Sequence, residues 1–542
     1  MGLKLIGVDD ANILFVYSKH LAAGEGLVYN IGEEHVEGFS SVSWMLLTTL
    51  GYLISNNPKI IFFAINIFLV GLALAYGWKT IQSISENSST FNTSLLNLPG
   101  FIWIIWIITN PSYFIWTTTS LMETGLWSSL LLSATFLLLN FINEHHVNRR
   151  QLKIFNLIIL ILLLTRPEGM AWSLYFLTAL LIILRQKDIG LLDIGRYWIP
   201  VAASSLICVA SLIIFRLNYF GFPLPNTYYA KMTSDPIFEI QWGLIYLQNF
   251  LIHNKIAGIL IFFALIIFLR YVISVLKLIT SGKKTLTPIQ FSRFFLSSTI
   301  LVGMLLPVLM GGDIFGGFRF FQPIWPLIIL PLLFWPAPKM LIESKSKVFI
   351  ICIVTLFAFT FAQTIRWPSL SLDRGRIAHL YELTHRGILT GQYIQEIFND
   401  SQNIQLPTIG VSAAGGYKMG YPGLVIDTMG LNFTPMAHHK GNKRGTRGHA
   451  SFNKEIFWQN ATDLVEPTLC PPKGPPVNRH DDPENWLFQI YQNLFVEEIF
   501  KQSYQFIAIQ SPDSGGWLCT YIKKDLLQSL ESNGAYEIVY VD

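Results

Sequence analysis

The sequence predicts an α-helical polytopic membrane protein that ends in a soluble α+β domain. Of its 542 residues, 52% are hydrophobic and only 13% are charged, whereas soluble domains average about 25% charged residues. The mean hydropathy is +0.44. Long apolar segments recur up to residue 364, and none of that length follows. This composition excludes a disordered chain, and a net charge of +4 is too small for a surface that tracks nucleic-acid phosphates.

Ten segments are apolar enough for membrane helices, which need about 20 mainly apolar residues. They lie at about 59–79, 100–118, 124–142, 153–165, 169–185, 197–216, 253–277, 293–310, 319–337 and 346–364. We therefore expect residues 1–364 to form a transmembrane domain that begins with an external loop, 1–58, carrying surface helices. Residues 365–542 contain strand-like runs such as GLVID, QFIAIQ and GWLCTYI between helical stretches, which predicts a separate α+β domain.

The positions of Lys and Arg in short loops predict the orientation of the spans. Basic residues gather at about 143–153, 270–293 and 338–347, which fall on one side of a ten-span count. That side should be cytoplasmic, so the N-terminal segment and the C-terminal domain should face the exterior. Cys470 and Cys519 both lie in that external domain, where a disulfide and two free thiols remain open alternatives.

The segment 41–56 is apolar, but it is short and ends at the polar break NNP. Counting it as a span would move the basic loops to the exterior, so we expect a helix lying on the external membrane surface. The ten-span count then leaves nothing before Asp9 to carry the N-terminus across the membrane, because MGLKLIGV is too short for a signal or a span. We therefore expect a first helix to be missing upstream of this sequence.

Acidic residues are the first candidates for chemistry. Asp9 and Asp10 begin a predicted helix of about four turns that Gly24 closes, and free backbone amides there favour ionised carboxylates. One acid suffices for a helix cap, so the second is a candidate catalytic group; two plain capping acids are the alternative. Glu123 stands in a long apolar region, where an acid is a functional hypothesis by default, although it could simply begin a helix.

Further external charges stand beside predicted turns. These candidates are Arg166 and Glu168 in TRPEG, Tyr228 and Lys231 in LPNTYYAK, and Asp313 and Arg319 in GGDIFGGFRF. Hydroxyls, cations and glycine-rich backbone are groups that bind phosphate. Acids and phosphate-binding cations beside an apolar bundle suit a reaction in which a lipid phosphate leaves and a hydroxyl attacks.

The sequence resembles the GT-C glycosyltransferases, in the branch of mycobacterial terminal arabinofuranosyltransferases. The resemblance rests on seven ordered segments: DDANILFVYSKHLAAGEGLVYNIGEEHVEGFSSVSW, SLMETG, TRPEG, LPNTYYAK, GGDIFGGFRF, IDTMGLN and RGTRGHA. They cover nearly the whole chain. Asn12 stands where the family often has Tyr, LMET replaces GMET, and the arginine loop is altered, which leaves the identity of the sugar open. The family also begins with a transmembrane helix before its DD pair, as expected above.

The resemblance implies an inverting transfer of a monosaccharide from a polyprenyl phosphate donor to a cell-envelope glycan or lipid acceptor. The sugar would be a pentose such as arabinofuranose, or a hexose. The active site and the C-terminal domain would face the periplasm from a bacterial plasma membrane. Asp9 or Asp10 would be the base and Glu123 the second acid, with His449 on the acceptor side. The donor phosphate and its pocket would involve Arg166, Glu168, Tyr228, Lys231, Asp313 and Arg319. A divalent ion such as Mg or Mn, if one is used, would be held by Asp9, Asp10 and Glu123.

Two other classes of function remain open. A transporter or flippase of lipid-linked sugars is the main alternative, although the chain shows no internal repeat and its acids fall at one membrane face. A glycan-binding protein would use Trp458, Trp486 and Trp517 for stacking, and core packing of these rings is the plainer interpretation. The histidines 438, 439 and 449 lack an acid at metal-ligand spacing.

Overall fold

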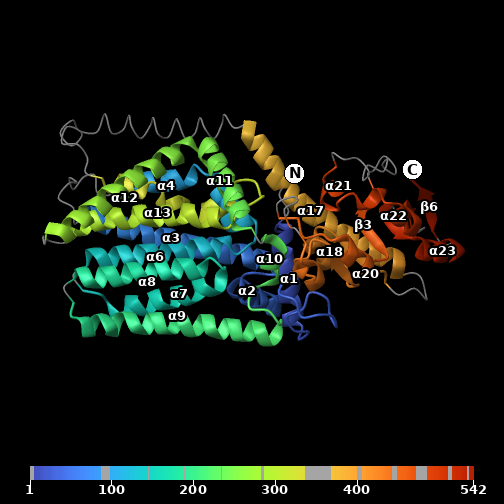
Figure 1. Cartoon of the computed structure of the whole chain (residues 1–542), viewed down its shortest axis with the longest axis horizontal. Helices are drawn as coiled ribbons and strands as arrows, with labels where there is room; N and C mark the ends of the chain where they lie inside the picture. The colour runs from blue at the N-terminus through green and yellow to red at the C-terminus, as the bar shows by residue number, and fades with distance from the viewer. Residues whose placement is uncertain are drawn as a thin grey trace. The chain divides into compact units, whose positions relative to one another are not determined.

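The computed structural model of the chain describes residues 5–86, 98–144, 146–187, 189–233, 235–281, 286–335, 368–399, 406–441, 443, 448–470, 485–510, 516–533 and 536–541. The chain forms two compact units. The sheet unit comprises Met1–Ile60, Ile213–Asp235 and Ala378–Asp542. The helical unit comprises Ile61–Leu212 and Pro236–Ile377. Figure 1 labels their helices and strands.

Among the described residues, six helices are long and apolar enough to cross a bilayer. They are α3 (Lys59–Glu86), α6 (Thr124–Asn143), α8 (Gly169–Gln186), α9 (Leu191–Tyr219), α12 (Lys255–Ser281) and α13 (Pro288–Leu309). Six such helices indicate a polytopic membrane protein.

Ten spans were expected, and the described residues carry fewer. The segment 100–118 is divided into α4 (Leu98–Ile108), α5 (Pro111–Phe114) and the π-helix η2 (Ile115–Thr119), because Pro111 has no N–H to continue α4. Residues 319–335 form the 3₁₀ helix η3 (Arg319–Leu327), which contains two prolines, and the short α14 (Leu330–Leu333). The helix α7 (Arg149–Thr165) has 17 residues, just under a span. The expected span 346–364 lies outside the described residues.

A further helix replaces a predicted loop. Residues 217–252 lie between two expected spans and were therefore expected to be a loop. They include the end of α9 and two helices, α10 (Asn226–Lys231) and α11 (Pro236–His253). In the helical unit, α11 packs on α13 with Gly243 against Val308: a Cβ at 243 would lie 2.0 Å from the Val308 carbonyl oxygen. Small residues at such crossings let helix backbones approach closely. A hydropathy scan misses α11 because polar side chains interrupt its apolar run.

The hairpin of α7 and α8 and the helix α6 give the helical unit two chemically different ends. The start of α6, the end of α7 and the start of α8 carry Glu123, Arg166 and Glu168. At the other end, the Lys187 ammonium donates to the Glu144 carbonyl, and α7 starts with two arginines. The unit therefore has one end with an acid–arginine cluster and one end rich in cations.

The sheet unit holds a six-stranded mixed sheet in the order β2-β1-β3-β5-β4-β6. Its strands are β1 (Ile409–Val411), β2 (Val425–Asp427), β3 (Leu464–Leu469), β4 (Tyr504–Gln510), β5 (Leu518–Lys523) and β6 (Glu537–Tyr540). The first three pair in parallel and the others antiparallel. The strand-like runs GLVID, QFIAIQ and GWLCTYI correspond to β2, β4 and β5, so those predictions are confirmed.

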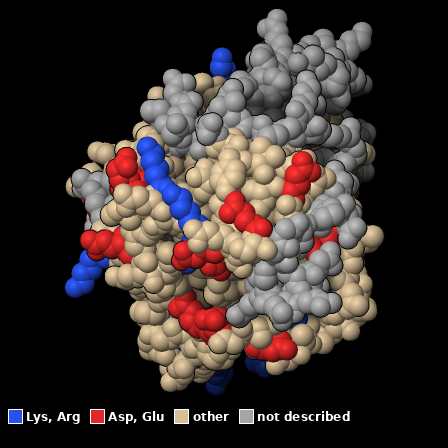
Figure 2. All heavy atoms as spheres, turned by 90° about the vertical axis from the view of Figure 1, so that its right-hand side faces the viewer, with Lys and Arg blue, Asp and Glu red and all other residues tan. Residues whose placement is uncertain are grey.

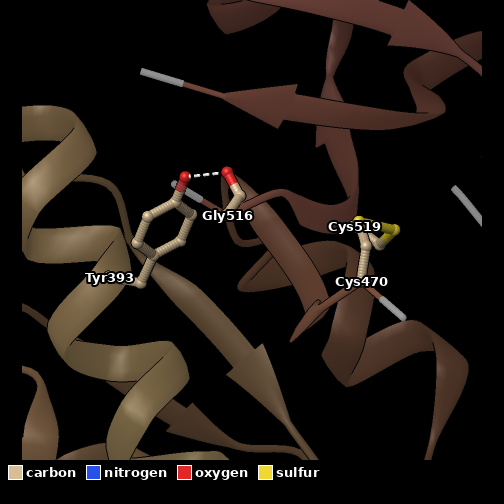
Figure 3. Close-up of a disulfide and its surroundings, with 4 residues drawn as sticks. All are labelled: Tyr393, Cys470, Gly516 and Cys519. Carbon is tan, nitrogen blue, oxygen red and sulfur yellow. Dashed lines mark hydrogen bonds between the residues drawn. A yellow bond between two sulfur atoms is a disulfide. The ribbon is translucent and has the colours of Figure 1, made fainter. Parts of the chain in front are cut away.

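One long helix and several short ones belong to the C-terminal part of the chain around this sheet, and aromatic side chains fill the core. The helices are α17 (Pro368–Asn399), α18 (Ala414–Gly420), α19 (Thr434–His438), α20 (Lys454–Gln459), α21 (Trp486–Ile490), η4 (Leu494–Val496), α22 (Glu498–Ser503) and α23 (Lys524–Asn533). A disulfide joins Cys470, after β3, to Cys519 in β5. Figure 3 shows it together with the nearby hydrogen bond from the Tyr393 hydroxyl to the Gly516 carbonyl.

Two N-terminal helices belong to the same unit as the sheet. They are α1 (Asp9–Ala22), which ends before Gly24 as expected, and α2 (Val42–Ile54). The cap residue of α1 is Val8, and both aspartates lie in its first turn. Where α1 meets α18, a Cβ at Gly415 would lie 2.1 Å from the Asp9 carbonyl oxygen. Only a glycine permits this approach, and it brings the acid pair against the first turn of α18.

Acidic side chains mark one outer face of the molecule. Figure 2 shows Asp and Glu in several separate groups across this face, with few Lys and Arg between them.

Candidate functional site

The sheet unit fixes the side chain of Asp9 from two directions. The first turn of α1 holds its backbone, and its carboxylate accepts the N–H groups of Gly415 at 3.0 Å and Gly416 at 2.7 Å. Both glycines lie in the first turn of α18, where backbone N–H groups have no partner within the helix. Asp9 therefore occupies a position that backbone donors define, and its carboxylate cannot rotate without losing them.

The environment of Asp9 brings the pKa of its carboxyl group close to neutral pH. Burial raises the pKa of Asp9 from 3.8 to about 6, against the lowering effect of the Gly416 and Gly415 N–H groups. The neighbouring charges of Asp10 and Asp427 raise this pKa further. A carboxylate with such a pKa is mostly ionised at neutral pH and is a stronger base than an exposed aspartate, as general base catalysis requires.

Asp10 and Lys231 lie beside Asp9 and remain reachable from solvent. The Lys231 ammonium lies 3.5 Å from the Asp10 carboxylate, with 37% and 22% of the two side chains exposed. Tyr228 lies on the same short helix as Lys231 and is 39% exposed. The sequence analysis gave Asp9 and Asp10 the catalytic role and placed Tyr228 and Lys231 at the donor phosphate. In the structure Asp9, Asp10 and Lys231 form one group, and Tyr228 lies on α10 with Lys231.

Asn226 fixes the position of α10. Its side-chain amide donates to the carbonyls of Gly430 and Leu431, at 2.7 and 3.1 Å, and its backbone N–H donates to the Glu37 carbonyl. Its amide oxygen lies 3.1 Å from Nε2 of His438. These bonds attach the helix that carries Lys231 to the loop after β2, so they hold Lys231 at its distance from Asp10.

Sequence reasoning missed Asp427, which ends β2. Its carboxylate is buried and accepts the N–H of Met429 at 3.0 Å and both the N–H and the side-chain amide of Asn432, at 2.9 and 2.8 Å. Burial raises the pKa of Asp427 to about 6, although the Asn432 donors lower it. The sequence did hold a signal for this residue, because GLVIDTMGLN places an acid directly at the end of a short apolar run that predicts a strand.

Sequence reasoning also missed a buried ion pair between Glu37 and Arg216. The guanidinium binds the carboxylate through Nε at 2.8 Å and Nη2 at 2.9 Å, and both side chains are at most 4% exposed. The available signal was an arginine within the apolar stretch of α9 that follows Arg196, since such a charge requires a partner. The Glu37 backbone also accepts from Asn226, so this pair supports the position of α10.

His449, assigned to the acceptor side, lies against Trp486. The two rings meet edge to face with their centroids 5.0 Å apart. Trp486 is 44% exposed, whereas Trp458 and Trp517 pack against the core of the sheet unit. Of the three tryptophans considered for sugar stacking, Trp486 is therefore the one with a substantially exposed ring.

In the helical unit, Arg166 joins Glu123 and Glu168. Its Nη1 lies 2.5 Å from the Glu123 carboxylate, and Nη2 lies 3.1 Å from that of Glu168. All three side chains are at most 12% exposed. Burial alone would raise the pKa of Glu168, but the Arg166 charge and hydrogen bonds hold it below its usual value. The predicted turn with the Arg166–Glu168 pair is thus present, and Glu123 is a second carboxylate bound to Arg166.

Arg319 and Asp313 form a second pair in the same unit. The guanidinium binds the carboxylate at 2.7 Å through Nε and at 3.2 Å through Nη2. The phenyl ring of Phe320 lies under both guanidinium groups, 4.9 Å from Arg166 and 5.1 Å from Arg319. Arg319 also contributes to the low pKa of Glu168. The five charged residues predicted in this part of the chain therefore form one cluster.

This cluster borders a small pocket within the helical unit. Its charged walls are Arg166, Glu168 and Arg319, so two cations and one acid face it. Its other lining residues are Thr124, Trp127, Leu131, Trp172, Gly303, Leu306, Pro307, Phe320, Pro323 and Ile324. The hydroxyl of Thr124 is buried and has no hydrogen-bond partner among the described residues. A buried polar group of this kind is costly unless something satisfies it, so the pocket offers a place for a ligand oxygen.

The structure thus assembles the predicted residues into two groups, one in each unit. Asp9, Asp10 and Lys231 belong to the sheet unit, and the Glu123–Arg166 cluster belongs to the helical unit. Within the described part of the chain, no group of three or more His, Cys, Asp or Glu side chains is arranged to hold a metal ion. No protein-family model matches the chain, and a search of curated proteins returns no match.

Proposed function

We propose that this chain is an integral-membrane glycosyltransferase that moves a monosaccharide from a polyprenyl phosphate to a hydroxyl of a cell-envelope glycan or lipid. The pocket of the helical unit carries the proposal. Two guanidinium groups, the Glu168 carboxylate and the buried Thr124 hydroxyl share it with apolar walls. A ligand that satisfies both kinds of wall has an anionic head and a hydrocarbon tail. A polyprenyl phosphate sugar is such a ligand, and the resemblance to GT-C enzymes implies the same class.

In this proposal the donor phosphate binds to Arg166 and Arg319. Each guanidinium has five N–H donors, so it can hold a phosphate oxygen in addition to the carboxylates that it already binds, two for Arg166 and one for Arg319. The carboxylates of Glu123, Glu168 and Asp313 keep the two guanidinium groups in place. Preorganised cations stabilise the negative charge that the phosphate gains as it leaves.

The base is the second part of the proposal, and the resemblance to GT-C enzymes implies Asp9 or Asp10. The acceptor hydroxyl forms a bond to the anomeric carbon, the bond from that carbon to the phosphate oxygen breaks, and the phosphate keeps the electron pair. A carboxylate takes the hydroxyl proton. We assign this role to Asp9, because two backbone N–H groups fix it and its pKa is about 6. Attack from the face opposite the phosphate inverts the anomeric configuration.

Charge and redox chemistry support an external position for the reaction. Cations near Lys187 and the start of α7 mark one end of the helical unit, and such ends face the cytoplasm. The opposite end, with Arg166, would then face the exterior. The Cys470–Cys519 disulfide favours an oxidising compartment for the sheet unit. We therefore propose a bacterial plasma membrane with the sheet unit in the periplasm.

The test is a transfer assay with the purified chain in nanodiscs. Polyprenyl phosphates carrying arabinofuranose or a hexose are supplied with cell-envelope glycan acceptors, with and without EDTA. We expect a glycosylated product and free polyprenyl phosphate. Asp9→Asn should lower the rate by about 10²–10⁴-fold, the usual range for loss of a general base. Arg319→Gln should raise the donor concentration needed for half-maximal rate.

The matched control is Asp193→Asn, because Asp193 is an acid that is 52% exposed in an ordinary helix pair. It should transfer at the parent rate. If Asp9→Asn and Asp10→Asn both retain that rate, the assignment of the base is wrong. Movement of intact lipid-linked sugar across the bilayer, without cleavage of its sugar–phosphate bond, would identify a flippase instead.

A further inference from the structure

Residues 412–416, which we call the donor segment, carry the two backbone donors that fix Asp9. The segment follows the end of β1 at Val411 and runs into the first turn of α18. Its last two residues, Gly415 and Gly416, donate their N–H groups to the Asp9 carboxylate. The position of this carboxylate therefore depends on whatever holds the donor segment in place.

A partly buried acid in β3 binds the first residue of the donor segment. The Glu466 carboxylate accepts the Ser412 N–H and the Tyr491 hydroxyl, both at 2.6 Å and both through Oε1. Burial raises the pKa of Glu466, against the lowering effect of the bonds from Tyr491 and Ser412. A carboxyl group is costly to bury unless it is hydrogen-bonded. The proposed reaction gives this acid no chemical role, so its bonds to the donor segment call for another explanation.

The peptide group between Val411 and Ser412 is held from both sides. Its N–H donates to Glu466, and its carbonyl accepts the N–H of Thr428 at 3.0 Å. The Thr428 hydroxyl lies 2.7 Å from the hydroxyl of Tyr491, which itself donates to Glu466. These contacts form a closed ring around one peptide group, so the start of the donor segment cannot move without breaking several bonds.

The other end of the donor segment is bound to the same place in β3. Tyr417, the next residue of α18, donates its hydroxyl to the carbonyl of Pro467, which directly follows Glu466. The register of β3 is irregular here, between Val465 and Thr468, and Glu466 has a φ of 46°. Such a φ is uncommon for a residue other than glycine, and irregularities of this kind redirect side chains. One short stretch of β3 therefore holds the donor segment at both ends.

We infer that Glu466 is a positioning residue for Asp9. Together with the Pro467 carbonyl it holds the donor segment, and the donor segment holds the Asp9 carboxylate. Its effect on the reaction passes through the backbone of the donor segment. That effect rests on the proposed function, whereas the link between Glu466 and Asp9 is a property of the fold.

Loosening of the donor segment raises the pKa of Asp9. Hydrogen bonds to an ionised carboxylate lower its pKa, as the N–H groups of Gly416 and Gly415 do for Asp9, and their loss reverses this effect. A base that is displaced by 1 Å can also slow a reaction about 10²-fold. Loss of the negative charge of Glu466 alone has the opposite effect on the pKa of Asp9, because a nearby like charge raises the pKa of a carboxyl group.

The experiment measures the rate of transfer against pH for purified variants in nanodiscs. Glu466→Leu removes both bonds to Oε1, whereas Glu466→Gln keeps an amide oxygen that can accept both. In Glu466→Leu we expect the rate to fall about 10²-fold and the midpoint of its decline toward low pH to move above the parent value. Glu466→Gln should retain most of the parent rate, with a midpoint at or below the parent value. The charges of Asp10 and Asp427, which also raise the pKa of Asp9, are the same in both variants.

A second pair of variants covers the case in which Glu466→Leu does not fold. Tyr417→Phe removes only the hydroxyl that binds the Pro467 carbonyl, and it should also move the midpoint above the parent value. Its matched control is Tyr421→Phe, which removes a similar bond, from a buried tyrosine hydroxyl to the Pro407 carbonyl, outside the donor segment. Tyr421→Phe should leave the midpoint at the parent value.

A double-mutant cycle tests the link without any transfer. Asp9→Asn and Glu466→Leu are made singly and together, and the fall in the melting temperature in detergent is measured. Tyr417→Phe replaces Glu466→Leu in the cycle if the latter does not fold. Because both changes act on the same donor segment, we expect the double variant to lose less than the two single losses added together.

Three results would overturn the inference. These are additive losses in the cycle, a parent midpoint in both Glu466→Leu and Tyr417→Phe, and a midpoint in Glu466→Gln that rises as far as in Glu466→Leu. A coupled cycle in a chain that transfers no sugar would leave the link to Asp9 standing and reject the proposed function.

Discussion

The carboxylate of Asp9 accepts the backbone N–H of Gly416 at 2.7 Å, and this bond joins the first turn of α1 to the first turn of α18. The same carboxyl has a pKa raised by burial to about 6, as has that of Asp427 at the end of β2. Two acids that join separate segments of the sheet unit therefore titrate well above an ordinary aspartate. Their titration links the stability of this unit to pH.

We expect these two acids to lower the stability of the folded chain as pH rises from about 4 to 7. The pKa of each rises from the ordinary aspartate value of 3.8 to about 6 on folding, so the folded chain binds more protons than the unfolded chain between these values. Their contribution is present below pH 4 and is lost as pH rises through 6. It amounts to at most about 3 kcal/mol for each group, at about 1.4 kcal/mol per pKa unit.

The measurement is the melting temperature of the detergent-solubilised chain between pH 4.5 and 7.5. Asp427→Asn, which keeps the shape of the side chain, should remove part of the decline with pH. Asp193→Asn should keep the parent slope, because Asp193 is exposed. An identical slope in parent and Asp427→Asn would show that Asp427 is not the source.

Lys231 should matter for transfer and not for folding. Its pair with Asp10 spans 3.5 Å and is partly exposed, and such pairs contribute about 0–1 kcal/mol. We expect Lys231→Met to change the melting temperature by no more than a degree or two. Transfer should fall roughly 10–100-fold, because the variant loses the hydrogen bond that Lys231 is expected to donate to the donor phosphate. A hydrogen bond to a charged group contributes about 1.5–3 kcal/mol.

Lys19→Met is the control for this variant, since it removes an exposed lysine from the end of α1. It should change neither the melting temperature nor the rate of transfer. A loss of stability in Lys231→Met as large as the loss of transfer would make Lys231 a structural residue.

Local patterns predicted the features that local residues determine. Composition gave the membrane class, alternating apolar runs gave β2, β4 and β5, and TRPEG gave the Arg166–Glu168 turn. The count of spans failed where Pro111 interrupts an apolar run, because a hydropathy average does not register a missing N–H. The helix α11 was missed because its polar side chains lower the hydropathy average. Its packing on α13 through Gly243 is a tertiary contact that such an average does not register.

The site could be predicted as a set of residues but not as an arrangement. Arg166 meets Glu123 from 43 positions away, and Asp9 meets Gly416 from 407 positions away. No periodicity encodes such pairs, because they depend on which helices the tertiary fold brings together. Asp427 was missed for the same reason: its function as a hydrogen-bond acceptor depends on the loop that folds back to it at Asn432.

The disulfide should be a major support of the sheet unit. Cys470 and Cys519 close a loop of 49 residues, and loop entropy predicts about 4 kcal/mol for a loop of that size. We expect Cys519→Ser, or reduction of the parent with dithiothreitol, to lower the melting temperature by several degrees. Cys208→Ser should have no such effect, because Cys208 forms no disulfide within the described part of the chain. If reduction leaves the melting temperature unchanged, the bond is not a support of the folded chain.

The last prediction separates the structural role of Arg166 from its proposed role in binding. Arg166 lies between Glu123 and Glu168, and all three side chains are at most 12% exposed. Arg166→Met leaves two buried carboxylates without their cation, which costs about 3–5 kcal/mol. We expect a poorly folded variant with a much lower melting temperature. Glu123→Gln and Glu168→Gln, added to Arg166→Met, remove the uncompensated charges and should restore much of the lost stability.

The restored triple variant then tests binding with the fold intact. If the guanidinium of Arg166 holds a phosphate, this variant should bind polyprenyl phosphate more weakly than the parent, because a charge-assisted hydrogen bond is lost. Quenching of intrinsic fluorescence measures the binding, since Trp127 and Trp172 line the pocket. Parent-like binding in a stable triple variant would limit Arg166 to neutralising the two glutamates, and the donor phosphate would have to be held by Arg319 alone or elsewhere.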